Sequence, residues 1–304
     1  MVSLDFKAFR EAVFRLYNQG AFREALALMD EQAGRFPQEG CDLYYWRACL
    51  ACRVGDPAAG LAWLQEASDR GDWYHESVLQ DPDLAPLSES DQFAAVRAAF
   101  QERYAVAQAK AQPLLKAWSP AGEARGLLLA LHGAGGNIES EEESDHWRPA
   151  VALGWRVALA QSSQVWAPGK YFWRDREVGI TEVGGHVAAL QAPETTVLAG
   201  FSQGAGLAMH AVLGGTLAVD RFLAVAPAIR PEALLPLLAA CRREVRGYIV
   251  IGEQDRYCPA AVAVANAMKQ AGLACELELH PGLGHDFPAG FPTALERRLA
   301  HLTR

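Results

Sequence analysis

The stretch TTVLAGFSQGAGLAM, residues 195–209, decides the fold of this chain. Its first five residues are typical of a buried strand, the small residues at its end favour a helix, and GFSQG at residues 200–204 joins the two as a G-x-S-x-G motif. A tight turn between strand and helix strains the central residue, so we expect the Ser202 hydroxyl to stand exposed above the sheet. The motif alone is weak evidence, and its flanking strand and helix make it specific.

Outward from this motif, apolar runs alternate with helical segments. Each run is short and bounded by glycine, proline or charge, as expected of strands buried on both faces of a sheet. The predicted strands are residues 126–131, 155–160, 195–200, 221–226, 247–251 and 274–279. The predicted helices are residues 177–191, 203–214, 231–242, 259–272 and 289–302. This alternation predicts a doubly wound, mostly parallel α/β sheet.

A serine hydroxyl is a poor nucleophile without a general base, and the base needs an acid to orient it. In such a sheet the base is expected after the last strand and the acid after the strand before it. His285 and Asp255 occupy these two places, so Ser202, Asp255 and His285 form the predicted catalytic triad. The nearest competitors are His280 and Glu253, which both lie closer to the strand ends.

The segment HGAGGN, residues 132–137, directly follows the first strong strand. Acyl transfer passes through a tetrahedral oxyanion, which needs two N–H donors already aimed at it. A loop of glycines lets the backbone approach the substrate oxygen, and Gln203, the residue after the nucleophile, supplies the second donor. We expect His132 and Gly133 beside the substrate. The loop lacks the lysine of a P-loop and the spacing of a dinucleotide site, which argues against phosphate binding.

Together with GEQD at residues 252–255 and GLGH at residues 282–285, these segments resemble the phospholipase/carboxylesterase branch of the α/β-hydrolase superfamily. That branch includes acyl-protein thioesterases. The resemblance implies an α/β-hydrolase fold and hydrolysis of carboxylic or thio esters without a cofactor or a metal. It also implies that the backbone N–H groups of Ala134 and Gln203 are the oxyanion donors.

The N-terminal region has helical spacing throughout and repeats itself. Residues 20–26 align with residues 55–61 and, more loosely, with residues 90–96, and each copy has a small residue where two helices would approach closely. Those small residues are Ala25, Gly60 and Ala95. The pattern Y-x-x-G-x-F-x-x-A-L at residues 17–26 resembles the tetratricopeptide repeat, which implies a surface for a protein partner.

We therefore expect two domains, tetratricopeptide-like helical repeats at residues 1–115 and an α/β-hydrolase domain at residues 120–304. Pro113 and SPAG at residues 119–122 break the helical pattern and mark a linker between them. The sequence leaves open whether the repeats bind a partner or cap the active site.

Composition narrows the partners and the compartment. The net charge is −8 and no basic run exceeds Arg242-Arg243, so a nucleic acid is not expected. Residues 1–15 mix charged and apolar residues unlike a signal peptide, and no apolar stretch is long enough to span a bilayer. The six cysteines are scattered, and Cys49 and Cys52 fall within a helical pattern, so we expect them to be reduced and buried. These features favour the cytoplasm.

Four aromatic residues precede the helix predicted at 177–191, and two of them, Trp166 and Trp173, are expected to contact the substrate. The alternative is that these aromatics form ordinary core under a loop. The acidic run at residues 139–145 is interpreted as a solvated helix start.

Two other functions remain open at this point. A peptidase of the same fold would use the same triad, which cannot by itself separate amide from ester cleavage. The second is a protein-binding module in which the repeats bind a partner and the hydrolase domain is scaffold. The complete set of catalytic groups argues against this second alternative.

Overall fold

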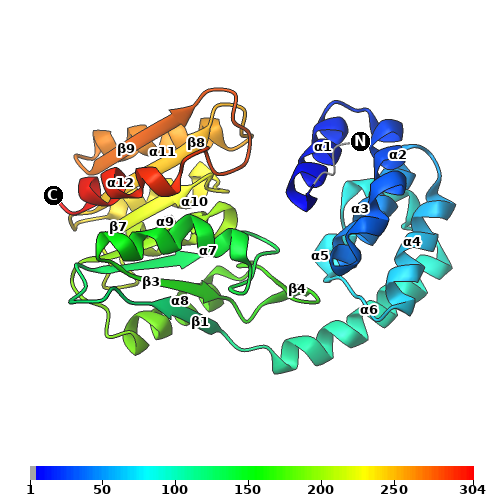
Figure 1. Cartoon of the computed structure of the whole chain (residues 1–304), viewed down its shortest axis with the longest axis horizontal. Coiled ribbons are helices and arrows are strands. Elements are labelled where there is room, and N and C mark those ends of the chain that lie inside the picture. Colours follow the sequence, from blue (N-terminus) through cyan, green and yellow to red (C-terminus); the bar gives the residue numbers. More distant parts are fainter. Residues whose placement is uncertain (1–4) are drawn as a thin grey trace. The chain divides into compact units, whose positions relative to one another are not determined.

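The computed structural model describes residues 5–304, which form two compact units (Figure 1). The first unit holds the residues up to Lys110 together with Val165–Pro168, and the second holds Ala111–Gln164 and Gly169–Arg304. Residues 1–4, part of the stretch weighed above as a signal peptide, lie outside the described residues. No helix within residues 5–304 combines the length and the apolar character needed to cross a bilayer.

The second unit is built on a seven-stranded sheet with the strand order β1-β3-β2-β6-β7-β8-β9. Strand β1 runs antiparallel to β3, and all the other pairs are parallel. The strands are β1 (Leu114–Trp118), β2 (Leu127–Leu131), β3 (Arg156–Gln161), β6 (Thr196–Phe201), β7 (Arg221–Val225), β8 (Arg246–Gly252) and β9 (Ala274–His280). The six strands predicted from the sequence are confirmed.

Strand β1 lies where the sequence analysis expected a linker. It pairs along its whole length with β3, from Leu114 opposite Gln161 to Trp118 opposite Val157. The strand is short, contains Lys116 and lies at the sheet edge, so it lacks the continuous apolar character of the strands inside the sheet. Its identity as a strand comes from pairing with residues 39 to 47 positions away.

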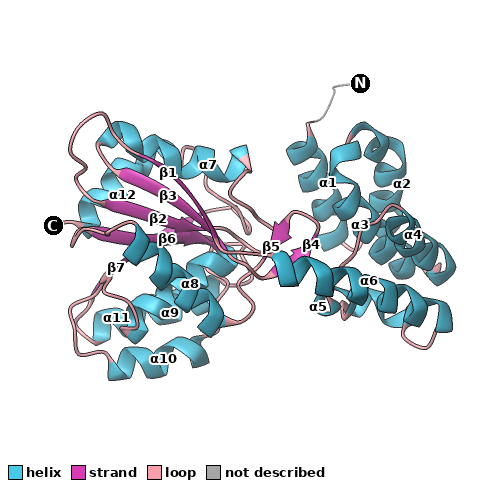
Figure 2. Ribbon diagram, turned by 90° about the horizontal axis from the view of Figure 1, so that it is seen from below, coloured by secondary structure: helices cyan, strands magenta, loops and turns pink. Residues whose placement is uncertain are grey.

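Helices cover both faces of the sheet because side chains alternate along each buried strand. Leu127, Leu129 and Leu131 enter the core under α8 to α11, whereas Leu128 and Ala130 enter the core on the opposite face, under α7 and α12. Figure 2 shows the two helical layers on either side of the strands. These helices are α7 (Glu141–Trp147), α8 (Arg176–Ala189), α9 (Ser202–Gly214), α10 (Pro231–Ala240), α11 (Cys258–Gln270) and α12 (Leu295–Leu302).

The last helix begins later than the sequence predicts, at Leu295 rather than residue 289. Gly290 has a φ of 71°, and Pro292–Ala294 form a 3₁₀ turn, η5, before the α-helix starts. A glycine in the left-handed region and a proline without an N–H both oppose an α-helix at this place. The other short 3₁₀ turn of this unit is η4 (Arg148–Leu153).

Up to Lys110, the described part of the first unit consists of helices and short 3₁₀ turns. The α-helices are α1 (Phe6–Asn18), α2 (Phe22–Gln32), α3 (Gly40–Arg53), α4 (Pro57–Asp69), α5 (Glu76–Leu79) and α6 (Asp91–Lys110). The turns are η1 (Ala33–Arg35), η2 (Pro37–Glu39) and η3 (Pro82–Leu87).

The repeated small residues behave as expected in two of the three copies. Ala25 is fully buried, and a Cβ on Gly60 would lie 2.7 Å from Cys52 Sγ, so α4 packs against α3 without room for a side chain. Ala95, in contrast, is exposed on α6, and the expected close approach at this position is wrong. The buried face of this part of α6 is formed instead by Phe93, Val96 and Phe100.

The segment Val165–Pro168 belongs to the first unit although it follows β3 of the second. The N–H of His75 donates to the carbonyl of Trp166 at 2.8 Å, and the N–H of Val165 donates to Gln108 Oε1 at 3.1 Å. This segment forms β4 (Val165–Ala167), and β5 (Lys170–Tyr171) pairs with it. Trp166 is therefore held by the first unit.

Candidate active site

Ser202 stands at the junction of β6 and α9 and has a φ of 51°, a left-handed conformation that is rare outside glycine. Two flanking glycines make the junction possible. A Cβ on Gly200 would lie 2.6 Å from the carbonyl carbon of Gly204, and a Cβ on Gly204 would lie 2.4 Å from the carbonyl oxygen of His132. The turn therefore has no space for side chains on either side of the serine.

Ser202, His285 and Asp255 are joined by two short hydrogen bonds. Ser202 Oγ lies 2.8 Å from His285 Nε2, and His285 Nδ1 lies 2.7 Å from Asp255 Oδ2. An ionised carboxylate can only accept, so the imidazole proton belongs on Nδ1 and Nε2 is free to accept the serine proton. The Asp255 side chain is fully buried, and its other oxygen accepts the N–H of Tyr257 at 2.9 Å. The aspartate is thus fixed, and the His285 ring is oriented by it.

The two competitors lie elsewhere. His280 is on β9 with Nε2 2.9 Å from Glu278 Oε1, in an ion network with Arg298. Glu253 is exposed. The hydrogen bonds to Ser202 and to Asp255 are made by His285 instead.

Some backbone N–H groups near Ser202 donate hydrogen bonds within the protein, and others have no acceptor. In the loop at residues 132–137, three N–H groups have acceptors: Gly133 (Glu143 Oε1), Gly135 (Tyr171 carbonyl) and Gly136 (Gly133 carbonyl). Within residues 5–304, the N–H groups of Ala134 and Gln203 have no acceptor. Gln203 is the second residue of α9, where N–H groups are left free by the helix and carry the positive end of its dipole. These two groups can receive a negatively charged oxygen.

His132 is buried beneath this loop, and both of its ring nitrogens are engaged. Nδ1 donates to the Gly133 carbonyl at 2.7 Å, and Nε2 accepts the Ser162 N–H at 3.3 Å. Burial lowers the pKa of His132 to about 4, although the hydrogen bond to Gly133 opposes this shift. The ring is therefore neutral near pH 7 and serves to hold the loop.

Trp173 is 3% exposed and packs into the core beneath the loop. Its indole N–H donates to the His132 carbonyl at 3.0 Å, and its ring stacks on the His132 ring at 4.9 Å. Its backbone N–H donates to Gln203 Oε1 at 2.8 Å. This placement favours the second interpretation of the aromatic residues, core under a loop, at this position.

Glu143 is a site residue that the sequence analysis missed by assigning residues 139–145 to a solvated helix start. The Glu143 carboxyl group contacts the loop through the Gly133 N–H. The available signal was its spacing of four residues from Trp147, which places both on one face of α7. Trp147 is fully buried, so that face points inward.

One group of potential metal ligands occurs among the described residues, in the first unit. It consists of Cys49, Asp81 and Asp83, whose ligand atoms lie within 4.8 Å of one another. Tyr45 and Tyr17 donate hydroxyl hydrogen bonds to the two carboxylates at 2.7 and 2.6 Å, and burial raises the pKa of the Cys49 thiol. A protonated thiol and occupied carboxylates describe a closed hydrogen-bond network better than a metal site.

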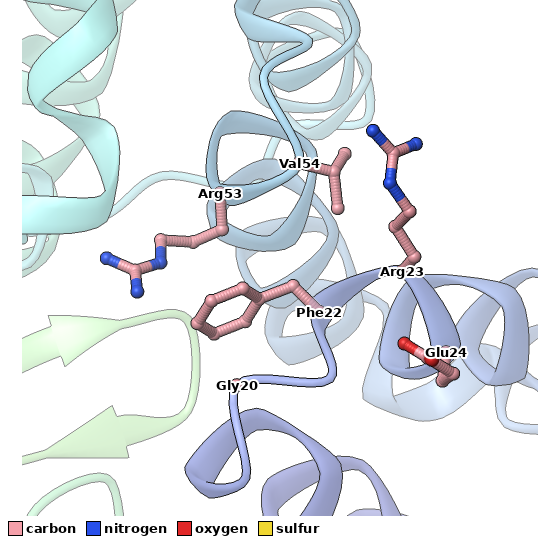
Figure 3. Close-up of a pocket in the computed structure, with 6 residues that line it drawn as sticks. All are labelled: Gly20, Phe22, Arg23, Glu24, Arg53 and Val54. Carbon is pink, nitrogen blue, oxygen red and sulfur yellow. The ribbon is translucent and has the colours of Figure 1, made fainter.

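The first unit also has a shallow pocket of about 270 Å³ between the start of α2 and the end of α3 (Figure 3). The Arg53 guanidinium lies 4.2 Å from the centre of the Phe22 ring and 3.6 Å from Asp83. The pocket is lined by Gly20, Phe22, Arg23, Glu24, Arg53 and Val54. None of these six residues was predicted from the sequence to bind a substrate or a ligand.

Comparisons with known proteins agree with the architecture. Residues 6–108 match the family described as A/B hydrolase-like, N-terminal domain. An uncharacterized protein from Bacillus cereus ATCC 10987 is similar over 98% of this chain and 99% of its own, with 24% identity and a TM-score of 0.53. Esterase PE8 is similar over 63% of this chain and 98% of its own, with 19% identity and a TM-score of 0.53. The chain has an α/β-hydrolase fold.

A third solved structure with this fold is Est1E from Butyrivibrio proteoclasticus with ferulic acid bound. It is similar over 64% of this chain and 96% of its own, with 17% identity and a TM-score of 0.50. No protein with a curated functional description matches the sequence. At these identities the likeness extends to the fold, and the chemistry must be argued from the site.

Proposed function

We propose that this chain is a serine hydrolase that cleaves carboxylic or thio esters through an acyl-enzyme intermediate, in the manner of a carboxylesterase. One observation carries the proposal: Ser202 Oγ, His285 and Asp255 are joined by contacts of 2.8 and 2.7 Å, and within the described residues the N–H groups of Gln203, the next residue, and of Ala134 have no acceptor. A nucleophile, its base and an oxyanion site are the groups that acyl transfer requires.

In the proposed acylation step, Ser202 Oγ attacks the carbonyl carbon and its proton passes to His285 Nε2. The carbonyl oxygen becomes an oxyanion that accepts hydrogen bonds from the N–H groups of Ala134 and Gln203. Asp255 stays ionised and stabilises the imidazolium. When the intermediate collapses, His285 returns the proton to the departing alcohol or thiol, leaving an ester on Ser202.

In the proposed deacylation step, water replaces the leaving group. His285 takes one proton from the water while its oxygen attacks the acyl carbon, and the second oxyanion occupies the same pair of N–H groups. Collapse returns the proton to Ser202 Oγ and releases the carboxylic acid. His132, whose nitrogens are both engaged, holds the loop through these steps and exchanges no proton.

An ester is the first substrate class to test, because esterase PE8 and Est1E have the same fold. Amide cleavage is the alternative, since the same groups would serve a peptidase. Contact of Gly133 with the substrate remains part of this proposal, and contact of Trp166 with it stays a prediction from the sequence. For Trp173 we propose support of the loop through the His132 carbonyl.

For the first unit we propose tetratricopeptide-like repeats that bind a protein partner. Helices α2 and α4 begin thirty-five residues apart, at Phe22 and Pro57, and each packs against the helix before it. Binding of a protein partner by the first unit would add to hydrolysis by the second and would not replace it.

The deciding experiment is hydrolysis of p-nitrophenyl acetate, butyrate and octanoate by the full chain, with Ser202→Ala as the matched control. We expect turnover that depends on Ser202 and a burst of p-nitrophenol when deacylation is the slower step. Turnover that survives in Ser202→Ala, or a folded wild-type protein inactive on all three esters, would contradict the proposal.

A further inference from the structure

Glu143, in the first turn of α7, contacts the loop at residues 132–137 at two of its glycines. Its Oε1 lies 3.4 Å from the Gly133 nitrogen, and a Cβ on Gly136 would lie 2.9 Å from the same oxygen. The loop takes part in the proposed reaction, whereas this carboxyl group takes part in none of its steps. A partly buried acid beside an oxyanion site needs a physical reason to be there.

Helix capping does not supply that reason. Ser140 caps α7 by accepting the Glu143 N–H at 3.3 Å, and the spacing Ser-x-x-Glu is that of a capping box. In a capping box the glutamate carboxylate returns to the N–H of the capping residue. Here the Glu143 carboxyl group reaches the Gly133 N–H instead.

The helix that carries Glu143 is itself held firmly against the candidate active site. One turn further along α7, the His146 ring stacks on Phe287 with 3.7 Å between ring centres. Phe287 in turn stacks on Phe201, the neighbour of Ser202, at 4.6 Å. These contacts fix α7 relative to the loop after His285, so the carboxyl group is presented from a rigid support.

We propose that Glu143 is a positioning residue of the oxyanion site: it accepts the Gly133 N–H and thereby orients the peptide so that the Ala134 N–H remains free for the substrate oxygen. This inference rests on the proposed esterase function. The two N–H groups lie in successive peptide planes that meet at the Gly133 Cα. Glu143 holds the first plane, and the hydrogen bonds of His132 Nδ1 and the Gly136 N–H to the Gly133 carbonyl hold the second, so the two planes are fixed together. Without the Glu143 carboxyl group the loop could rotate and misdirect the Ala134 N–H. This should lower kcat more than it raises KM.

The charge state of Glu143 agrees with this role. Burial raises the pKa of Glu143 to about 7, with the hydrogen bond from Gly133 opposing the shift and the neighbouring Glu142 adding to it. His132, across the loop, has a lowered pKa of about 4 and is neutral in this range. A neutral carboxylic acid still accepts an N–H through its carbonyl oxygen and adds no negative charge beside a developing oxyanion.

Kinetics of three full-length variants test the proposal. Glu143→Gln keeps a neutral acceptor and should retain kcat within about twofold, whereas Glu143→Leu should lower kcat about tenfold or more with KM within about twofold. Glu142→Gln, the matched control on the exposed side of α7, should resemble the wild type. Unchanged kcat in folded Glu143→Leu, or an equal fall in Glu143→Gln and Glu143→Leu, would overturn the proposal.

A second readout separates this inference from the esterase proposal. In deuterated, ¹⁵N-labelled protein, the Gly133 amide resonance should titrate with a midpoint near pH 7, lose that step in Glu143→Gln and keep it in Glu142→Gln. A Gly133 amide indifferent to Glu143 would refute the positioning role whatever the enzyme activity. A titrating amide in a protein without serine-dependent turnover would instead count against the esterase function alone.

Discussion

At the scale of single residues, the candidate site concentrates conformational strain on Ser202. A left-handed backbone at a residue with a side chain costs about 1–3 kcal/mol and persists only where surrounding packing enforces it. This packing is close at Gly200 and Gly204, where any Cβ would overlap backbone atoms. The G-x-S-x-G pattern could be read from the sequence because both glycines are required within one turn. The hydrogen bonds that join Ser202, His285 and Asp255 could be seen only in the folded chain.

The orientation of His285 leads to a prediction at this scale. In Asp255→Asn, the amide can donate to Nδ1, which moves the imidazole proton to Nε2 and removes the base. We expect kcat on p-nitrophenyl butyrate to fall by about 10³–10⁴-fold with little change in KM. Asp286→Asn, one residue beyond the histidine, is the matched control and should stay near wild-type activity. A loss of less than about tenfold in Asp255→Asn would argue against the assigned role.

At the scale of elements, the ion network at Glu278 fixes α12 to the last strand. Arg298 on α12 is 1% exposed, and its guanidinium contacts the Glu278 carboxylate on β9 at 2.9 Å. Burial alone would raise the pKa of Glu278, but hydrogen bonds from Arg298 and Tyr248 and the charges of Arg298 and Arg297 lower it to about 2. No local sequence pattern indicates this network, because its members are about twenty to fifty residues apart.

This lowered pKa gives a prediction for acid stability. A carboxylate with a depressed pKa in the folded state stabilises the fold above its unfolded pKa of about 4.3, and that contribution is lost as the pH falls toward about 2. Arg298→Met should therefore lower the free energy of unfolding at pH 7 by about 3 kcal/mol and weaken its dependence on acid pH.

The matched control is Arg297→Met. Arg297 contacts the same carboxylate at 3.1 Å, but its side chain is 66% exposed, so its loss should cost less than about 1 kcal/mol. Urea unfolding at pH 3, 5 and 7 measures both variants. Equal effects of the two substitutions would contradict the assignment of the stabilising role to Arg298.

At the scale of the whole molecule, the chain leaves the second unit after Gln164, passes through the first as Val165–Pro168 and returns at Gly169. Val165 and Ala167 are 5% and 2% exposed, so the short segment is part of a packed core. Its backbone is tied down by His75 and Gln108. The linker expected at residues 119–122 implies one boundary between the units. The structure instead has the chain cross between the units at more than one place.

We expect Gln108→Ala to loosen this segment. It removes the acceptor of the Val165 N–H, and a buried donor left without a partner costs about 1–3 kcal/mol. Amide hydrogen exchange should become faster by about tenfold or more at Val165, whereas Gln101→Ala, on the exposed face of the same helix, should leave it unchanged. Unaltered exchange at Val165 in Gln108→Ala would show that the segment is held by other contacts.

The sequence by itself determined the six parallel strands and the junction at Ser202, because apolar periodicity and turn glycines are local properties of the chain. It also placed Asp255 and His285 after the strands that bring them to Ser202, since the carboxyl ends of parallel strands share one edge of a sheet. Only the tertiary structure decided the pairing of β1, the burial of Trp173 and the place of Glu143 behind the loop. Each of these depends on contacts between residues at least ten positions apart, which no local pattern encodes.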